Sequence, residues 1–289
     1  MAGDGHTAPR AMDEPVGLLA GAGRLPFMVA EGVKRAGRKL AVIGFRGSVE
    51  MGLQVLADRF STVGVTRLST VIRLFRRWGV HRAVMVGRVA KDTMYSPARL
   101  LQMFPDWRSA RIWYLKLRKD RRDLRVLTAV ADELAGEGIE LISSVHYCTE
   151  HLAHEGQMTR TAPDPRALAD AEFGWRIARQ SADLDIGQAV AVKERDIIAV
   201  EAMEGTDRMI QRTGAICRGG GWTLIKVARH NQDMRFDVPT IGPDTIRRLS
   251  LCGGACLVVE AGKTIIVDKP QTLALADSLG IPVLGMKDV

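Results

Sequence analysis

The first half of this chain alternates short apolar stretches with amphipathic ones, and this alternation limits the fold more than any other feature of the sequence. Strands are predicted at residues 16–20, 39–45, 83–87 and 139–145. Helices are predicted at 26–36, 69–78 and 123–136, the second capped by Ser69, and another helix begins at Ser96-Pro97. Because strands that alternate with helices form βαβ units, we predict a Rossmann-like parallel sheet covered by helices.

The second half predicts another α/β domain, of mixed topology. Helices are expected at 166–180, 205–213, 244–251 and 272–279, and strands at 188–192, 197–201, 223–227, 256–260, 264–268 and 282–286. A polar stretch broken by Ala162-Pro-Asp-Pro165 separates the halves. We therefore divide the chain into a disordered tail (1–14), an N-terminal Rossmann-like domain with its linker (15–160) and a C-terminal α/β domain (161–289).

Composition agrees with a folded, soluble protein of 289 residues, since 46% of them are hydrophobic and 26% are charged. No apolar run approaches the ~20 residues that span a bilayer. The first fourteen residues lack the apolar stretch of a signal peptide, so the expected compartment is the cytoplasm. Cysteines there are expected to be reduced, and Cys252 and Cys256 are expected to be packed thiols.

A dense polar loop follows the strand predicted at 223–227. Lys226 lies in the strand, and the loop carries Arg229, Arg235, Asp233 and Asp237. Carboxylates bind a hard cation such as Mg²⁺ or act as general bases, while lysine and arginine neutralise phosphate oxygens. The loop therefore suits chemistry on a metal-chelated phosphate. The alternative is a surface loop held by ion pairs.

Two further segments carry groups that bind anions. The turn Gly21-Ala22-Gly23, with Pro26 behind it, begins a helix after the first strand and predicts either a diphosphate or uridine contact or a tight packing turn. It departs from a dinucleotide fingerprint, because Pro26 replaces the third glycine. The segment from Glu201 to Asp207 opens another helix, where Thr206 or Asp207 could instead be simple N-caps.

A stretch of cations and aromatic residues lies between Trp107 and Arg125. Its members include Arg108, Arg111, Lys116, Arg118, Trp113 and Tyr114. The net charge of the chain is +8, so this stretch could meet an anionic membrane surface or nucleic acid. The alternative is a solvated helix face whose aromatic side chains pack inward.

Several segments taken together identify a family. They are Gly17-Leu-Leu-Ala-Gly-Ala-Gly-Arg-Leu-Pro26, Leu184-Asp-Ile-Gly-Gln188, Ala199-Val-Glu-Ala-Met-Glu-Gly-Thr-Asp207, the stretch from Lys226 through Gln232-Asp-Met-Arg-Phe-Asp237 to Pro239-Thr-Ile-Gly242, Glu260-Ala-Gly262 and Ala276-Asp277. The chain resembles the UDP-2,3-diacylglucosamine pyrophosphatases of lipid A biosynthesis, the magnesium-dependent family that lacks the metallophosphoesterase fold. Two departures are His230, where the family usually has proline, and Lys119-Asp-Arg-Arg-Asp123, where a Gly-Asp-Asp element is usual; the second weakens any role for Asp120 or Asp123.

The resemblance implies hydrolysis of UDP-2,3-diacylglucosamine to UMP and 2,3-diacylglucosamine 1-phosphate, by water attack at the sugar-side phosphorus, with the substrate held between two domains. It implies Mg²⁺, with Mn²⁺ as the alternative ion. Asp233, Asp237 and Lys226 are the candidate catalytic residues, and the two aspartates are also the candidate metal ligands. The candidate substrate-binding residues are Gly21, Ala22, Gly23, Gln188, Glu204, Gly205, Thr206, Asp207, Gln232 and Arg235.

A lipid-linked substrate also implies peripheral contact with the inner membrane surface, and apolar walls for two acyl chains, to which residues 94–117 could contribute. Nucleic acid is not the expected partner, and a homo-oligomer stays open. Two rival functions remain. One is a nicotinamide-dependent oxidoreductase on the N-terminal domain, which Pro26 and the lack of a ribose-binding carboxylate disfavour. The other is a lipid- or RNA-binding protein without catalysis.

Overall fold

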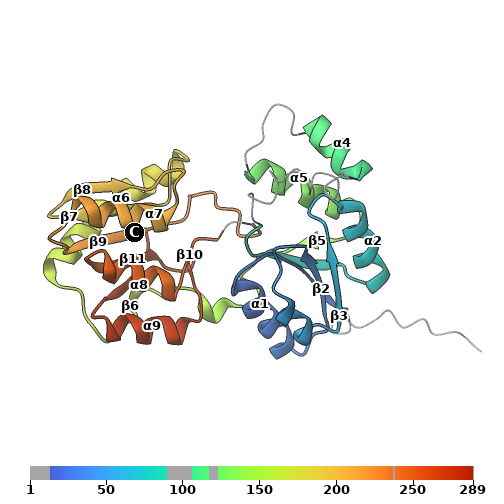
Figure 1. Cartoon of the computed structure of the whole chain (residues 1–289), viewed down its shortest axis with the longest axis horizontal. Helices are drawn as coiled ribbons and strands as arrows, with labels where there is room; N and C mark the ends of the chain where they lie inside the picture. Colours follow the sequence, from blue (N-terminus) through green and yellow to red (C-terminus); the bar gives the residue numbers. More distant parts are fainter. Residues whose placement is uncertain (1–13, 90–105, 117–122, 237, 289) are drawn as a thin grey trace, which may run out of the picture. The chain divides into compact units, whose positions relative to one another are not determined.

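The structure is a computed structural model that describes residues 14–89, 106–116, 123–236 and 238–288 (Figure 1). The chain divides into two compact units, Met1–Cys148 and Thr149–Val289. Both are α/β, as the sequence predicts. Among the described residues, no helix combines the length and apolar character that crossing a membrane requires.

The first unit is built on a five-stranded parallel sheet in the order β3-β2-β1-β4-β5. Its strands are β1 (Val16–Ala20), β2 (Leu40–Phe45), β3 (Arg59–Val63), β4 (Arg82–Val86) and β5 (Glu140–Leu141). The parallel sheet of the sequence prediction is confirmed. β3 escaped that prediction because it is an edge strand with little apolar pattern, and β5 has two residues where seven were expected.

Helices of the first unit include α1 (Leu25–Arg35), the 3₁₀ helix η1 (Met51–Leu56), α2 (Leu68–Trp78), α4 (Trp107–Lys116) and α5 (Asp123–Ala135). α1 leads from β1 to β2 and α2 leads from β3 back to β4, so right-handed connections bring them to opposite faces of the sheet (Figure 1). The helix expected at Ser96 lies outside the described residues.

The expected cap of α2 is wrong. Arg67 is the N-cap, and the backbone N–H of Ser69 donates to the Asp106 carboxylate at 2.5 Å. The same carboxylate accepts from the backbone N–H of Ser109 at 2.9 Å. Asp106 thus serves the first turns of α2 and α4 together. Burial raises the pKa of Asp106, but these N–H donors outweigh it and hold the pKa below its usual value.

The boundary between the units falls earlier than the sequence suggests. A Cβ on Gly32 of α1 would lie 1.6 Å from the carbonyl oxygen of Tyr147, so residues up to Cys148 pack on the first unit. Strand β6 (Gly156–Gln157) pairs with β13 (Val283–Met286) of the second unit. Residues 149–160, which the sequence assigned to the first domain, therefore fold with the second unit.

The second unit contains a six-stranded mixed sheet in the order β6-β13-β11-β9-β7-β8. Its remaining strands are β7 (Ala189–Lys193), β8 (Asp196–Val200), β9 (Trp222–Lys226) and β11 (Gly254–Glu260). β9, β11 and β13 run parallel, whereas β6 and the β7–β8 hairpin are antiparallel to their neighbours. The mixed topology predicted from the sequence is confirmed. A separate parallel pair joins β10 (Thr240–Ile241) to β12 (Ile265–Ile266).

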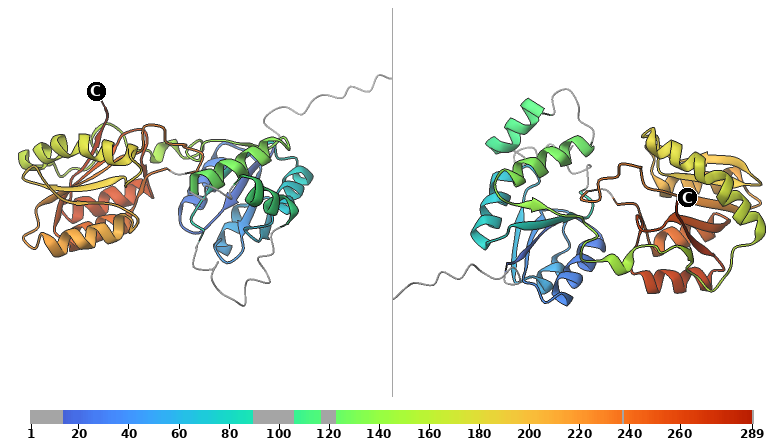
Figure 2. Two further views of the ribbon diagram at one scale, coloured as in Figure 1. Left: turned by 90° about the horizontal axis from the view of Figure 1, so that it is seen from above. Right: turned by 180° about the vertical axis from the view of Figure 1, so that it is seen from behind.

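Helices cover both faces of this sheet (Figure 2). α6 (Pro165–Asp183) packs on one face, where Ala171, Trp175 and Ala178 meet Val190, Ile225 and Val258. α7 (Thr206–Ile216), α8 (Pro243–Leu251) and α9 (Lys269–Ser278) cover the other. Residues of β9 therefore pack into an apolar cluster on each face of the sheet. This packing holds the position of the strand that carries Lys226.

All four cysteines are free thiols. Cys256 is buried in β11, and burial, with a smaller contribution from the negative charge of Asp164, raises the pKa of its thiol to about 12. A thiol with that pKa stays protonated near neutral pH, so Cys256 is the packed side chain that the sequence predicts.

Candidate active site

Lys226 ends β9 and is almost fully buried, with 9% of its surface exposed. Its Nζ donates to Thr206 Oγ1 at 3.0 Å and to the Thr240 carbonyl at 3.2 Å. The ammonium therefore joins the start of α7 to the start of β10. A buried ammonium held by hydrogen bonds is suited to receive a phosphate group, because the interaction is weakly screened.

The first turn of α7 is built around Thr206. Gly205, with φ +80°, is the N-cap, and no side chain caps the helix. Thr206 Oγ1 donates to Glu201 Oε1 at 2.9 Å, and Asp207 Oδ1 lies 3.4 Å from Arg248 Nε. The capping alternative for Thr206 and Asp207 is therefore wrong. Thr206 instead connects a lysine to a carboxylate.

Glu204 is engaged elsewhere. Its carboxylate pairs with Arg212 of α7, which also donates to the Val200 carbonyl at 2.9 Å. The hydrogen bond from Arg212 lowers the pKa of Glu204. Glu204 thus secures the turn between β8 and α7, and Thr206 is the side chain from this turn that reaches Lys226.

Gln188 and Gln232 meet although 44 positions separate them. Gln188 Nε2 donates to Gln232 Oε1 at 3.4 Å, and the same oxygen accepts from the Arg229 backbone N–H at 3.1 Å. The structure therefore brings the segment before β7 against the loop after β9, as expected if both belong to one site.

Asp233 and Arg235 form a two-pronged ion pair within that loop. Arg235 Nε lies 2.9 Å from Oδ1 of Asp233, and Nη2 lies 2.7 Å from Oδ2. These hydrogen bonds hold the pKa of Asp233 below its usual value. Asp237, the other candidate carboxylate, lies outside the described residues. Within the described ranges, no group of three or more His, Cys, Asp or Glu side chains is placed to hold a metal ion.

A buried acid anchors the base of the loop. Glu260 ends β11, and its Oε2 accepts from the Ala228 backbone N–H at 2.7 Å and from Arg179 Nη1 at 2.8 Å. Its Oε1 lies 2.9 Å from Lys263 Nζ. The direction in which the chain leaves β9 is therefore set by β11 and α6. Glu201 and Glu260 both lie within the family motifs of the sequence, but no sequence pattern indicated a role for either.

The glycine turn of the first unit has its N–H groups occupied. Gly21 and Ala22 donate to the carbonyls of Val86 and Arg88, both at 2.8 Å, and Gly23 donates to Glu50 Oε1 at 3.3 Å. A Cβ on Gly21 would lie 2.6 Å from the Arg88 carbonyl oxygen. Close packing at the ends of β1 and β4 therefore explains why glycine is needed at position 21. This is the packing-turn alternative of the sequence analysis, and it requires no diphosphate contact.

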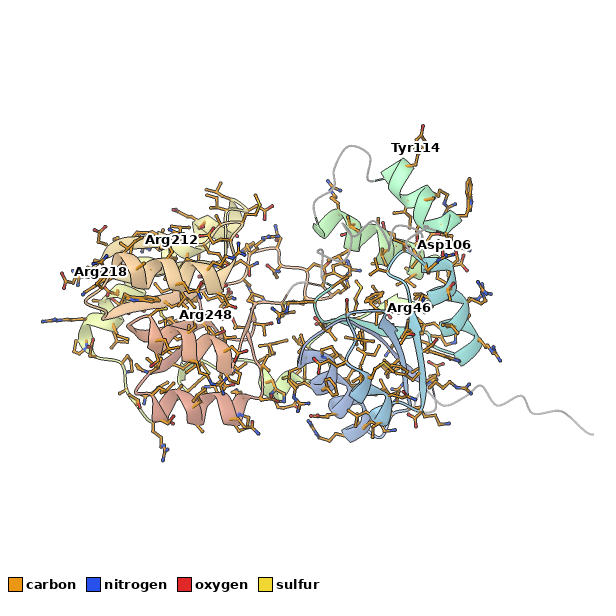
Figure 3. The ribbon with its side chains drawn as sticks, viewed as in Figure 1. Arg46, Asp106, Tyr114, Arg212, Arg218 and Arg248 are labelled. Atoms are coloured by element: carbon orange, nitrogen blue, oxygen red, sulfur yellow. The ribbon has the colours of Figure 1, made fainter. Side chains whose placement is uncertain are left out.

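The two arginines of α4 form ion pairs within the first unit. Arg108 contacts Glu133 at 2.8 Å and Glu137 at 2.6 Å, and Arg111 contacts Glu133 at 2.9 Å. Trp107 and Tyr114 instead remain 80% and 64% exposed, and Figure 3 shows Tyr114 pointing away from the helix. The alternative in which the aromatic side chains of this stretch pack inward therefore does not hold for Trp107 and Tyr114. Lys116 and Arg118 have side chains outside the described part of the chain.

Comparison with known proteins decides the family. Residues 15–151 match the model of the LpxI N-terminal domain, and residues 154–284 match that of the LpxI C-terminal domain. The chain belongs to the LpxI family. It is also similar to the UDP-2,3-diacylglucosamine pyrophosphatase LpxI of Caulobacter vibrioides, with 32% identity over 283 residues, 94% of this chain and 97% of that protein. The family suggested by the sequence motifs is therefore confirmed.

Among solved structures, the chain is similar to a nucleoside-diphosphate-sugar epimerase from Pseudomonas aeruginosa, at 13% identity and a TM-score of 0.29. The match covers 94% of this chain and 88% of that one. A likeness this weak supports no conclusion about fold or function. The cluster around Lys226 lies wholly within the matched LpxI C-terminal domain.

Proposed function

We propose that this chain hydrolyses the phosphoanhydride bond of UDP-2,3-diacylglucosamine and releases UMP and 2,3-diacylglucosamine 1-phosphate. Membership of the LpxI family carries the proposal, because the Caulobacter relative is named for a pyrophosphatase acting on this substrate. The buried Lys226 and the arginines of the loop after β9 supply the positive charge that a diphosphate requires.

Lys226 would stabilise the charge that develops on the phosphate oxygens. Its ammonium is held from two sides, by Thr206 and by the Thr240 carbonyl, so little reorganisation is needed when a phosphate arrives. Arg235 would supply a second, mobile cation. It can exchange the Asp233 carboxylate for a phosphate, because both bind the planar guanidinium in the same forked manner.

That exchange would release the Asp233 carboxylate for a second task. A free carboxylate beside the phosphate can accept a proton from the attacking water. We further propose that Asp233 and Asp237 hold Mg²⁺, or Mn²⁺ in its place. Their oxygens fit such hard ions, and a bound ion would neutralise the diphosphate and polarise its phosphorus. Asp233 would have to leave its ion pair with Arg235 before it could bind the ion together with Asp237. Metal binding would therefore depend on the conformation of the loop.

The substrate would be reached at the cytoplasmic face of the inner membrane by peripheral contact. Its two acyl chains belong in a bilayer, and the exposed Trp107 and Tyr114 of α4 are side chains that favour the membrane–water interface. This contact would depend on the aromatic rings more than on Arg108 and Arg111, because both arginines already pair with Glu133 of α5.

The decisive experiment uses purified protein, detergent-dispersed UDP-2,3-diacylglucosamine, Mg²⁺ and water enriched in ¹⁸O. We expect equimolar UMP and 2,3-diacylglucosamine 1-phosphate, with the heavy oxygen in the sugar phosphate because water attacks the sugar-side phosphorus. Label in UMP would move the attack to the other phosphorus. No cleavage of this substrate, together with cleavage of another nucleotide sugar, would overturn the proposed substrate.

A further inference from the structure

We infer that Glu201 is a positioning residue, which fixes the Lys226 ammonium through the hydroxyl of Thr206. The inference rests on the proposed function of Lys226 in phosphoanhydride cleavage. It adds a residue that does not touch the substrate but sets the geometry of one that does. Three elements contribute one side chain each: Glu201 follows β8, Thr206 begins α7 and Lys226 ends β9.

The order of donors and acceptors along this chain of side chains is fixed. Thr206 Oγ1 lies 2.9 Å from Glu201 Oε1 and 3.0 Å from Lys226 Nζ. An ammonium can only donate and an ionised carboxylate can only accept. The single hydroxyl proton of Thr206 must therefore point to Glu201, and its lone pair receives the proton of Lys226. Losing either end releases the hydroxyl to rotate.

The backbone holds Glu201 firmly enough to act as the fixed end. Its N–H donates to the Ala189 carbonyl at 2.8 Å, which ties it to β7. A Cβ on Gly187 would lie 2.0 Å from the Glu201 carbonyl oxygen, so the two segments are in close contact there. The Glu201 carboxylate therefore projects from a backbone with little freedom. It can fix the orientation of the Thr206 hydroxyl that donates to it.

The second oxygen of Glu201 indicates that folding alone does not explain this residue. Oε2 is buried and, within the described ranges, has no hydrogen-bond partner. Burying an acceptor without a donor is unfavourable, so a glutamate here is a poor choice for stability. Its negative charge, one hydroxyl away from a nearly buried ammonium, offsets the cost of keeping Lys226 charged out of water.

The experiment measures kcat and KM for UMP release by the full chain with Glu201→Ala, Glu201→Gln, Thr206→Val and Thr206→Ser. We expect kcat to fall about 10- to 100-fold in Glu201→Ala and Thr206→Val, the loss typical of a misplaced catalytic group. KM should change much less than kcat, as expected for a group that acts mainly in the transition state. Thr206→Ser should recover most of the kcat that Thr206→Val loses, because the hydroxyl is retained.

The double variant Glu201→Ala/Thr206→Val provides the sharpest readout. If Glu201 acts through Thr206, its kcat should match that of Thr206→Val alone, because the pathway is already broken. Multiplied losses would mean that the two residues act independently, and the inference would be overturned. The matched control is Glu172→Gln, at an exposed glutamate of α6, which should leave kcat unchanged.

Two further outcomes distinguish a failure of the role of Glu201 from a failure of the proposed function. A wild-type protein that releases no UMP from UDP-2,3-diacylglucosamine contradicts the proposed function itself. An active wild type with a normal kcat in folded Glu201→Ala, judged by an unchanged melting temperature, overturns the role of Glu201 alone. If the melting temperature falls, Glu201→Gln decides, because it keeps an acceptor for Thr206 and should show an intermediate kcat. A Glu201→Gln kcat as low as that of Glu201→Ala would overturn positioning through the hydrogen bond.

Discussion

Both oxygens of Asp233 accept hydrogen bonds from the guanidinium of Arg235, at 2.9 and 2.7 Å. The pair joins residues two positions apart, so it forms within one turn of the loop after β9. It keeps a carboxylate ionised beside a cation, and it holds the two groups together in the loop. An incoming diphosphate, which binds guanidinium in the same way, can separate them.

Replacing Asp233 with alanine should lower turnover by at least ~10²-fold, as expected for a lost acid–base group or metal ligand. Asp237→Ala should have a similar effect. Asp244→Ala is the matched control, because Asp244 is an aspartate of α8 whose side chain is 87% exposed. Steady-state UMP release checks all three. Near-normal turnover in a folded Asp233 or Asp237 variant would remove that residue from the chemistry.

Chelation should abolish activity. We expect loss of UMP release in excess EDTA and recovery on adding Mg²⁺ or Mn²⁺, because the candidate ligands are hard carboxylate oxygens. Zn²⁺ should restore activity poorly for the same reason. Isothermal titration with Mg²⁺ on Asp233→Asn gives a readout independent of turnover, and we expect weaker binding than in wild type. Full activity after exhaustive chelation contradicts the metal-dependent proposal.

Asp106→Asn should destabilise the first unit by about 1 kcal/mol, the usual cost of weakening a helix cap. The folded pKa of Asp106 is lowered from 3.8, so its stabilisation is complete above that value and is lost as pH falls through the folded pKa. Melting temperatures of wild type and variant should therefore differ near neutral pH and converge in acid. A difference that stays constant down to pH 2 would show that the charge plays no part.

Trp107→Ser/Tyr114→Ser should reduce binding to anionic vesicles and lower activity on vesicle-borne substrate, while sparing activity on substrate dispersed in detergent. Replacing Arg108, Arg111, Lys116 and Arg118 with serine tests the role of charge, since each unpaired cation near the surface would contribute about 1 kcal/mol. Because Arg108 and Arg111 are ion-paired, we expect the aromatic variant to lose more binding and the salt dependence to be modest. If wild type and all variants sediment equally with the vesicles, α4 is a solvated helix that does not contact the membrane.

The regular elements of this fold could largely be predicted from the sequence. β1 is a continuous apolar run, and β9 is apolar except for Thr223 and Lys226. Glycines and prolines beside such runs mark where helices begin and end. The edge strand β3 could not be found, because Arg59 and its polar neighbours give no periodic signal. The contact of Asp106 with the first turn of α2 could not be predicted either. Asp106 accepts a hydrogen bond from the Ser69 N–H, which lies 37 positions earlier in the sequence.

The candidate site shows a similar division. Lys226, Gln232 and Asp233 stood out because polar groups crowd one loop after an apolar strand. The sequence could not say that Lys226 meets Thr206, since 20 positions and a helix separate them. Nor could it show that the N–H groups of Gly21 and Ala22 are taken by the end of β4, because a strand partner is a matter of tertiary structure.

The pairing of β6 with β13 determines where the protein can be cut. A fragment that starts at residue 161, the domain boundary predicted from the sequence, would lack β6 and Thr159, whose hydroxyl accepts from the Val283 N–H at 2.9 Å. It would also lose the Arg160 N–H that binds Asp277 at 2.8 Å. The last strand would then present an open edge, a ready template for aggregation. Expression of the second unit alone should therefore begin at Thr149, where the edge stays protected.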